Sequence, residues 1–115
     1  MDVESIHKAD LLVRQANQVL SDAGVPITAT QLSALSFIGS DGPRTLGEVA
    51  QALSVTPAVV TGLVDRLERG KFAIRTGAVG PDRRCTWVEI TEAGRIVLDD
   101  AKQALIEAQE GQAAA

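Results

Sequence analysis

The hydrophobic residues of this chain recur at helical spacing along most of its length. Near the N-terminus, Ile6, Val13 and Leu20 lie seven positions apart, and further apolar residues beside them widen the stripe. This pattern predicts one long helix with an apolar face, which Gly24 and Pro26 end.

Two short helices are predicted next, each from a capping box. Thr28 and Thr45 are each followed three residues later by a glutamine or a glutamate. The threonine hydroxyl can accept a hydrogen bond from that residue's backbone N–H, while that residue's side chain accepts one from the threonine N–H. Apolar rows begin at Leu32 in the first helix and at Leu46 in the second, and residues 39–43 break the chain between them.

A fourth predicted helix has one apolar face and one face of small or charged side chains. Thr56 supplies an N-cap hydroxyl, Pro57 suits the first turn, and Gly70 ends the helix. The apolar face consists of Val60, Leu63, Val64 and Leu67. The opposite face and its flanks contain Ala58, Thr61, Gly62, Asp65, Arg66 and Arg69. Small side chains on a solvated face permit close approach of another molecule.

After this helix, the pattern changes from helical to alternating. Residues 71–76 and 85–91 are predicted as two strands, and the eight residues between them include two glycines and a proline. A last helix is predicted from about Glu92 toward Glu110. The chain has no internal repeat and no long linker, so residues 1–115 are predicted to form a single, mostly α-helical (α+β) domain.

The order of these elements predicts a DNA-binding fold. Two short helices joined by a tight turn and followed by a β-hairpin form a winged helix-turn-helix, whose second helix enters the major groove. Gly80 and Pro81 predict a firm turn at the hairpin tip, where a displayed arginine can enter the minor groove. Asp82 can hold the Arg84 guanidinium by a charge-assisted hydrogen bond, and a purely local ion pair is the alternative.

Charge is distributed unevenly along the chain. The net charge is −4, yet residues 66–84 contain six cationic and two anionic side chains. The acidic excess lies in residues 1–40 and 91–115. A basic patch on an acidic body is expected of a protein that meets phosphates on one face, and scattered solvated charge is the alternative interpretation.

Composition argues against several other classes of protein. The chain has one cysteine, Cys85, and one histidine, His7, which are too few for an internal disulfide or a zinc site. It has no long apolar run and its N-terminus is acidic, so we expect a cytoplasmic protein without membrane contact. No nucleophile with a neighbouring base and no phosphate-binding glycine loop occur, so neither enzymatic activity nor a metal or cofactor is expected.

Five short segments carry a more specific signal, through their order and spacing. They are Thr45-Leu-Gly-Glu-Val-Ala, Leu53-Ser-Val-Thr-Pro-Ala-Val-Val-Thr61, Leu63-Val-Asp-Arg-Leu-Glu68, Asp82-Arg-Arg84 and Ile90-Thr-Glu-Ala-Gly94. Together they resemble the successive signatures of the MarR family of bacterial transcriptional regulators, over roughly residues 28–98. The resemblance implies a winged-helix homodimer that binds pseudo-palindromic double-stranded DNA, usually represses transcription, and is released by a small phenolic ligand, an oxidant or a metal.

The resemblance also assigns roles to segments and residues. Residues 28–91 resemble the DNA-binding part, in which residues 56–69 match the recognition helix and residues 82–84 match the wing motif. The predicted DNA-binding residues are Thr45, Thr56, Pro57, Ala58, Thr61, Gly62, Arg66, Arg69, Asp82, Arg83 and Arg84. Residues 1–24 and 92–115 resemble the paired terminal helices of the dimer. The predicted interface residues are Ile6, Val13, Leu20, Val97, Ala101 and Leu105.

Several positions depart from the family pattern. Gly62 stands where many relatives have a long polar side chain, which favours shape readout over direct base contacts. Both terminal segments are short, so we expect a smaller dimer interface and a reduced or missing effector pocket. Cys85 is interpreted as a structural strand residue, with a reactive thiol beside two arginines as the alternative. Gly62 and the acidic total favour one alternative function, a winged-helix module that binds another protein instead of DNA.

Overall fold

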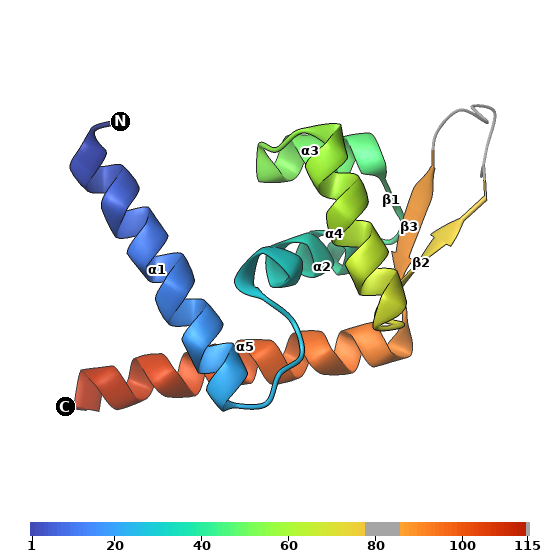
Figure 1. Cartoon of the computed structure of the whole chain (residues 1–115). Helices are drawn as coiled ribbons and strands as arrows, with labels where there is room; N and C mark the ends of the chain where they lie inside the picture. The colour runs from blue at the N-terminus through green and yellow to red at the C-terminus, as the bar shows by residue number, and fades with distance from the viewer. Residues whose placement is uncertain (78–85, 115) are drawn as a thin grey trace.

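The chain folds into packed helices with one small antiparallel sheet at one edge of the molecule (Figure 1). The computed structural model describes residues 1–77 and 86–114. In chain order the elements are α1 (Val3–Asp22), α2 (Ala29–Ser40), β1 (Arg44–Thr45), α3 (Leu46–Leu53), α4 (Pro57–Arg69), β2 (Ala73–Thr76), β3 (Trp87–Ile90) and α5 (Glu92–Ala114). The predicted mostly helical, α+β class is confirmed, and the last helix extends four residues beyond the predicted Glu110.

Threonine caps fix where the middle helices begin. The Thr28 hydroxyl accepts from the Gln31 N–H at 3.2 Å, and the Thr28 N–H donates to the Gln31 side chain at 2.7 Å. Thr45 and Glu48 form the same reciprocal pair at the start of α3, with both distances 3.0 Å. Thr56 caps α4 and is followed by a proline in the first turn. Both predicted capping boxes and the predicted start of α4 are confirmed.

The sheet contains one strand more than the predicted hairpin. Its order is β1–β3–β2, and both pairs are antiparallel. β2 and β3 are the predicted strands, although each is shorter than expected. In β1, Arg44 lies opposite Val88 of β3, and on the other side Val88 lies opposite Arg75 of β2. Directly paired residues share a face of the sheet, and Val88 is fully buried, so all three belong to the face that covers the core.

The core is built around α2, which contacts every other helix and β3. Leu35 and Ile38 of its predicted apolar row are buried, and Leu32 is half-buried. The predicted inward row of α4 is buried throughout, which confirms the helical register. The largest side chains with no exposed surface are Leu20, Leu35, Ile38, Val49, Val60, Val64, Leu67 and Val88.

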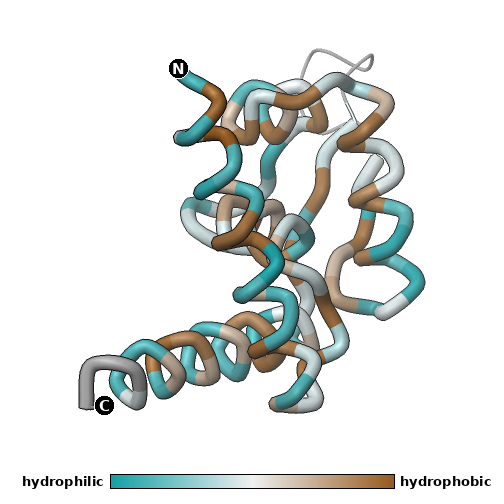
Figure 2. The backbone as a smooth tube through the Cα atoms, turned by 60° about the vertical axis from the view of Figure 1, so that its left-hand side comes forward, coloured by the Kyte–Doolittle hydropathy of each residue, from teal (hydrophilic) through white to brown (hydrophobic). Residues whose placement is uncertain are grey.

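The two terminal helices cross and then diverge from the rest of the chain (Figure 1). Leu20 of α1 and Val97 and Ala101 of α5 belong to the single hydrophobic core. In contrast, every residue from Met1 to Gln15 is exposed. Figure 2 shows hydrophobic residues recurring along this exposed part of α1. The N-terminal turns of α1 are therefore amphipathic, and their apolar side chains are not buried by any other element in the described part of the chain.

Hydrogen bonds and close backbone packing join the end of α4 to the start of α5. Lys71, in the turn after α4, has a φ of 65°. The Thr91 hydroxyl donates to the Lys71 carbonyl at 2.7 Å and accepts from the Gly94 N–H at 3.0 Å. A Cβ at position 94 would lie 2.0 Å from the Phe72 carbonyl oxygen, so only glycine fits there. Helix α5 therefore starts directly against the turn that follows α4.

None of the helices in the described residues is both long and apolar enough to cross a membrane by itself. In the same part of the chain, α3 and α4 have the required length and composition only as a pair, and this pair is bent by 110°.

Candidate nucleic-acid interface

The face of α4 that the sequence assigns to DNA is open to solvent. Pro57, Ala58 and Thr61 are exposed, and Gly62 is half-buried. A Cβ added at Gly62 would have no other part of the described chain within 4 Å, apart from the backbone of its own helix and its chain neighbours. The Thr61 hydroxyl donates to the Pro57 carbonyl at 3.0 Å, which leaves its lone pairs available as acceptors. The surface over these residues is formed by small side chains.

Two exposed arginines lie at the C-terminal end of the same helix. Arg66 and Arg69 occupy the last turn of α4, and both are exposed. Lys71 follows them and is also exposed. The helix thus presents a neutral, small surface in its first half, whereas its second half carries Arg66 and Arg69 together with the carboxylates of Asp65 and Glu68. Bare backbone and cations together suit a partner with negative charge.

Thr45 and Thr56, both predicted to bind DNA, also shape the helices that they precede. Each hydroxyl accepts the N–H of the residue three positions on. Thr56 is exposed, whereas Thr45 is half-buried and pairs with Trp87 in the sheet. The structure therefore gives Thr45 a positioning role at the start of α3. Contact of either residue with DNA stays a prediction.

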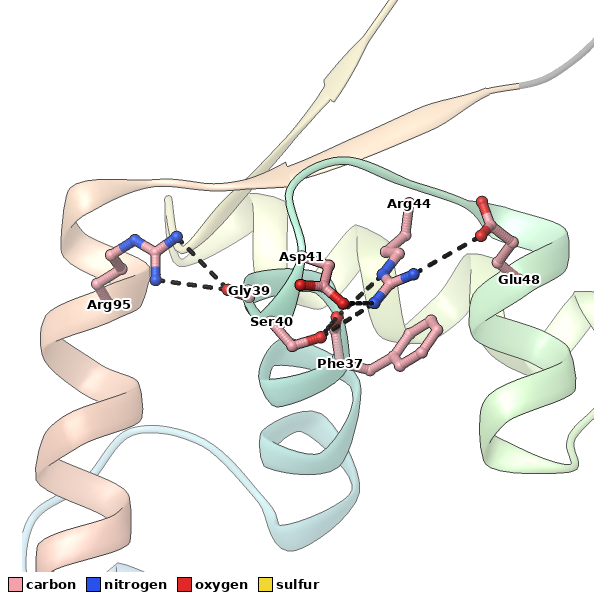
Figure 3. A network of polar contacts seen from close by, with 7 residues as sticks. All are labelled: Phe37, Gly39, Ser40, Asp41, Arg44, Glu48 and Arg95. Atoms are coloured by element: carbon pink, nitrogen blue, oxygen red, sulfur yellow. Dashed lines mark hydrogen bonds and ion pairs between the residues drawn. The ribbon is translucent and has the colours of Figure 1, made fainter.

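A network centred on Arg44 fixes the segment between α2 and α3 (Figure 3). The Arg44 guanidinium lies 4.3 Å from the centroid of the Phe37 ring and donates to the Ser40 hydroxyl at 3.1 Å. It also pairs with Asp41 at 3.6 Å and Glu48 at 3.8 Å. The Thr45 N–H, which donates to the Glu48 carboxylate, lowers the pKa of Glu48, and the Arg44 charge adds to this effect. This network was not predicted from the sequence, although the i,i+4 spacing of Arg44 and Glu48 is a local signal for their ion pair.

Arg75, counted in the predicted basic patch, has anionic partners on α4. Its guanidinium donates to Asp65 at 2.8 Å and also forms a hydrogen-bonded ion pair with Glu68. These partners lie seven and ten residues away along the chain, so helical spacing alone could not indicate them. The basic patch on the described residues is therefore smaller than the sequence count implies.

The wing motif falls outside the described part of the chain. Asp82, Arg83 and Arg84, predicted to bind DNA, and Cys85 all lie outside the described residues. Among the described residues, no cluster of His, Cys, Asp or Glu side chains is arranged to hold a metal ion.

The predicted dimer residues divide into two groups. Ile6 and Val13 are 50% and 45% exposed. Leu20, Val97 and Ala101, however, are buried inside the single chain, and Leu105 is half-buried against the core. The interface prediction is corrected for the three buried residues: they belong to the core of the single chain and have almost no surface left for a second copy. Other exposed apolar residues on the two helices are Val3, Leu11, Leu12, Ile96 and Ile106.

An open groove of about 710 Å³ lies beside α2. Leu32 and Phe37 of α2 and Leu53 of α3 line it, together with three serines of α2 and Lys102 of α5. Its position between the helix-turn-helix and α5 places it at the boundary of the two predicted parts of the chain. Apolar walls, hydroxyls and one ammonium suit a small amphipathic anion.

Sequence comparisons relate this chain to known regulators. A model described as MarR family matches residues 25–84. The HTH-type transcriptional repressor NicR of Pseudomonas putida is 33% identical over 73 residues, which are 64% of this chain and 46% of NicR. The HTH-type transcriptional repressor MdtR of Bacillus subtilis is 31% identical over 74 residues, which are 64% of this chain and 47% of MdtR. The chain thus spans about half the length of these curated relatives.

Several solved structures have the same fold as this chain over most of its length. The transcriptional regulator BldR of Sulfolobus solfataricus matches with a TM-score of 0.83 and 28% identity, over 95% of this chain and 77% of BldR. A mutant of E. coli MarR in complex with operator DNA matches with a TM-score of 0.79 and 27% identity, over 89% of this chain and 71% of that chain. M. tuberculosis MosR in complex with DNA matches with a TM-score of 0.79 and 25% identity, over 97% of this chain and 79% of MosR. The predicted winged helix-turn-helix fold is confirmed.

Proposed function

Because this chain belongs to the MarR family, we propose that it is a DNA-binding transcriptional regulator that acts as a homodimeric repressor. The observation that carries the proposal is the exposed face of α4, which combines small side chains with cations at its C-terminal end. Two structural relatives, MarR of E. coli and MosR of M. tuberculosis, were solved with DNA. In this proposal the chain has no catalytic activity and acts in the cytoplasm.

The proposed binding mode follows from the surface of α4. Ala58, Thr61 and Gly62 allow the helix to lie deep in a major groove, where the Thr61 hydroxyl can accept hydrogen bonds from base edges. The N-terminus of α4 carries partial positive charge, and Arg66 and Arg69 add full charges that favour phosphates. Few side chains on this face are long enough to read bases, so shape and deformability of the DNA supply part of the specificity.

Dimerisation completes the proposal. Residues 28–91 form the DNA-binding part, and residues 1–24 and 92–115 supply the dimer contacts. The exposed apolar residues of α1, Ile6 and Val13 among them, would be covered by a second copy. Two linked half-sites about 10 base pairs apart multiply the weak affinity of one small domain.

A small-molecule effector belongs to the proposal as well. The groove beside α2 contacts both the helix-turn-helix and α5, so a bound ligand there would contact the DNA-binding and dimer parts together. A ligand releases DNA only if it binds the DNA-incompetent arrangement better than the competent one. Lys102, the ammonium of this groove, favours an anionic effector.

Selection of bound sequences from a random pool of DNA duplexes tests this function. We expect enrichment of a pseudo-palindrome with half-sites about 10 base pairs apart. Fluorescence anisotropy on the enriched duplex and on a scrambled duplex of equal length should then show a sequence preference and an affinity that falls with salt. Failure to enrich any sequence, with no salt-dependent retention on heparin, would instead support the protein-binding module.

A further inference from the structure

Two carboxylates lie on the helix that should face DNA. Asp65 follows Thr61 by four positions on α4, so the two residues share one stripe of the helix. Glu68 is one turn further along the same side. The side chains of Asp65 and Glu68 are 44% and 32% exposed. Near a phosphate backbone, unpaired carboxylates at these positions would repel the ligand.

One side chain offsets both negative charges. One terminal nitrogen of Arg75 in β2 donates a hydrogen bond to the Asp65 carboxylate at 2.8 Å, and the other donates one to the Glu68 carboxylate. Its own side chain is 29% exposed, so water competes only in part for these bonds. A guanidinium has a rigid fork of donors, which allows it to hold two carboxylates in one fixed arrangement.

Arg75 also connects two elements that are expected to meet DNA in different grooves. It lies on β2, the strand that leads into the hairpin, and its backbone pairs with buried Val88 of β3. β2 contacts α4 directly, and Figure 1 shows the helix running alongside the sheet. The two ion pairs therefore fix the hairpin's first strand against the middle and end of α4.

From these contacts we infer that Arg75 is a positioning residue, which neutralises the carboxylates of α4 and holds strand β2 at a fixed angle to that helix. The inference rests on the proposed function, because it concerns how two DNA-facing elements act together. Arg75 itself is held by carboxylates and is not assigned a phosphate. Removing it should weaken binding in two separable ways. Repulsion from Asp65 and Glu68 should affect every duplex, whereas a β2 strand no longer held against α4 should affect the preferred sequence most.

Four variants separate these two effects. Arg75→Met removes the charge and the fork. Arg75→Lys keeps the charge and loses the fork. The combined Asp65→Asn, Glu68→Gln and Arg75→Met variant removes the link together with the repulsion. Arg44→Met is the matched control, because Arg44 also pairs with two carboxylates from a strand of the same sheet but joins α2 to α3. Thermal unfolding by circular dichroism identifies any variant that no longer folds.

Affinities for the selected duplex and for a random duplex give the first readout. Arg75→Met should bind the selected duplex about tenfold more weakly, which corresponds to about 1.4 kcal/mol. The combined variant should recover wild-type affinity for random duplex but keep a reduced preference for the selected one, and Arg75→Lys should behave in the same way. An unchanged preference in Arg75→Met, or losses equal to those of Arg44→Met on both duplexes, would overturn the inference.

Hydrogen exchange on the free protein gives a readout that needs no DNA. Arg75→Met should exchange the amides of β2 faster than the wild type does, whereas Arg44→Met should leave them unchanged. If the wild type binds no DNA while this change is present, the proposed function fails and the link between β2 and α4 stands. If β2 exchange is unchanged in Arg75→Met, the link is absent even in a protein that binds DNA.

Discussion

Replacing Gly62 with alanine should stabilise the protein while weakening its binding to DNA. Gly62 lies inside α4, where alanine is favoured over glycine by about 0.8 kcal/mol. Nothing outside the local backbone lies within 4 Å of the new Cβ, so no clash offsets this gain. For a domain of this size we expect a melting temperature about 4 °C higher.

Gly94→Ala is the matched control, and it is expected to have the opposite effect on the free energy of unfolding. Gly94 is also helical, but an added Cβ would lie 2.0 Å from the backbone oxygen of Phe72. Backbone atoms cannot move aside as a flexible side chain can, so overpacking should lower the unfolding free energy by about 1–3 kcal/mol or more. Thermal unfolding followed by circular dichroism on both variants measures the two shifts.

The DNA effect of Gly62→Ala depends on where α4 lies in the complex. If bare backbone at position 62 approaches the bases, a methyl group there should remove interactions worth on the order of 1 kcal/mol, or about a fivefold weaker Kd. Anisotropy on the selected duplex measures this effect. A variant that melts no higher than the wild type would refute the stability reasoning, and a more stable variant with unchanged affinity and preference would refute the placement of Gly62 at the contact surface.

Three further predictions test other parts of the proposal. Arg84→Ala should lower the salt slope of DNA binding by about one unit for each phosphate that the wing no longer neutralises, whereas Lys8→Ala, which removes an equal charge from α1, should not; equal slopes would remove the wing from the interface. Ile6→Asp and Val13→Asp together should shift sedimentation from dimer to monomer at equal concentration, because both side chains are exposed in the single chain; an unchanged mass would place the interface elsewhere. The fold lowers the pKa of Glu48, so its contribution to the free energy of unfolding is present above the unfolded pKa of 4.5 and is lost as the pH falls through the lower folded pKa. Glu48→Gln keeps a capping side chain, so its free energy of unfolding, measured by denaturant titration at a series of pH values, should fall less with decreasing pH than that of the wild type.

Helix starts and registers were predictable because neighbouring residues decide them. Thr28 with Gln31 and Thr45 with Glu48 satisfy the first free amides of each helix, whatever packs above them. The inward row of α4 follows from the spacing of its apolar residues alone. The exposed face of α4 follows in turn, since it is what remains after that row is buried.

Features set by distant partners were not predictable in the same way. β1 is two residues long and has no alternation to indicate it, since pairing with β3 alone defines it. The apolar stripes of the terminal helices indicate that Leu20, Val97 and Ala101 are buried. The spacing of apolar residues does not indicate whether they are buried by the same chain or by a second copy. Arg75 looks like any cation of the patch until the fold brings α4 beside β2.

The hydrogen bond from the Thr91 hydroxyl to the Lys71 carbonyl couples the orientation of α5 to the position of the end of α4. This helix has 23 residues, and at a rise of about 1.5 Å per residue it is roughly 34 Å long. Since its first turn is bonded to the turn after α4, a tilt of about 5° around its far end would displace the end of α4 by roughly 3 Å. In the proposed dimer, equal tilts in both subunits would move the recognition helices out of step with grooves about 34 Å apart. The contacts of Thr91 and Gly94 with the turn after α4 would thereby make operator binding sensitive to small rotations at the subunit interface.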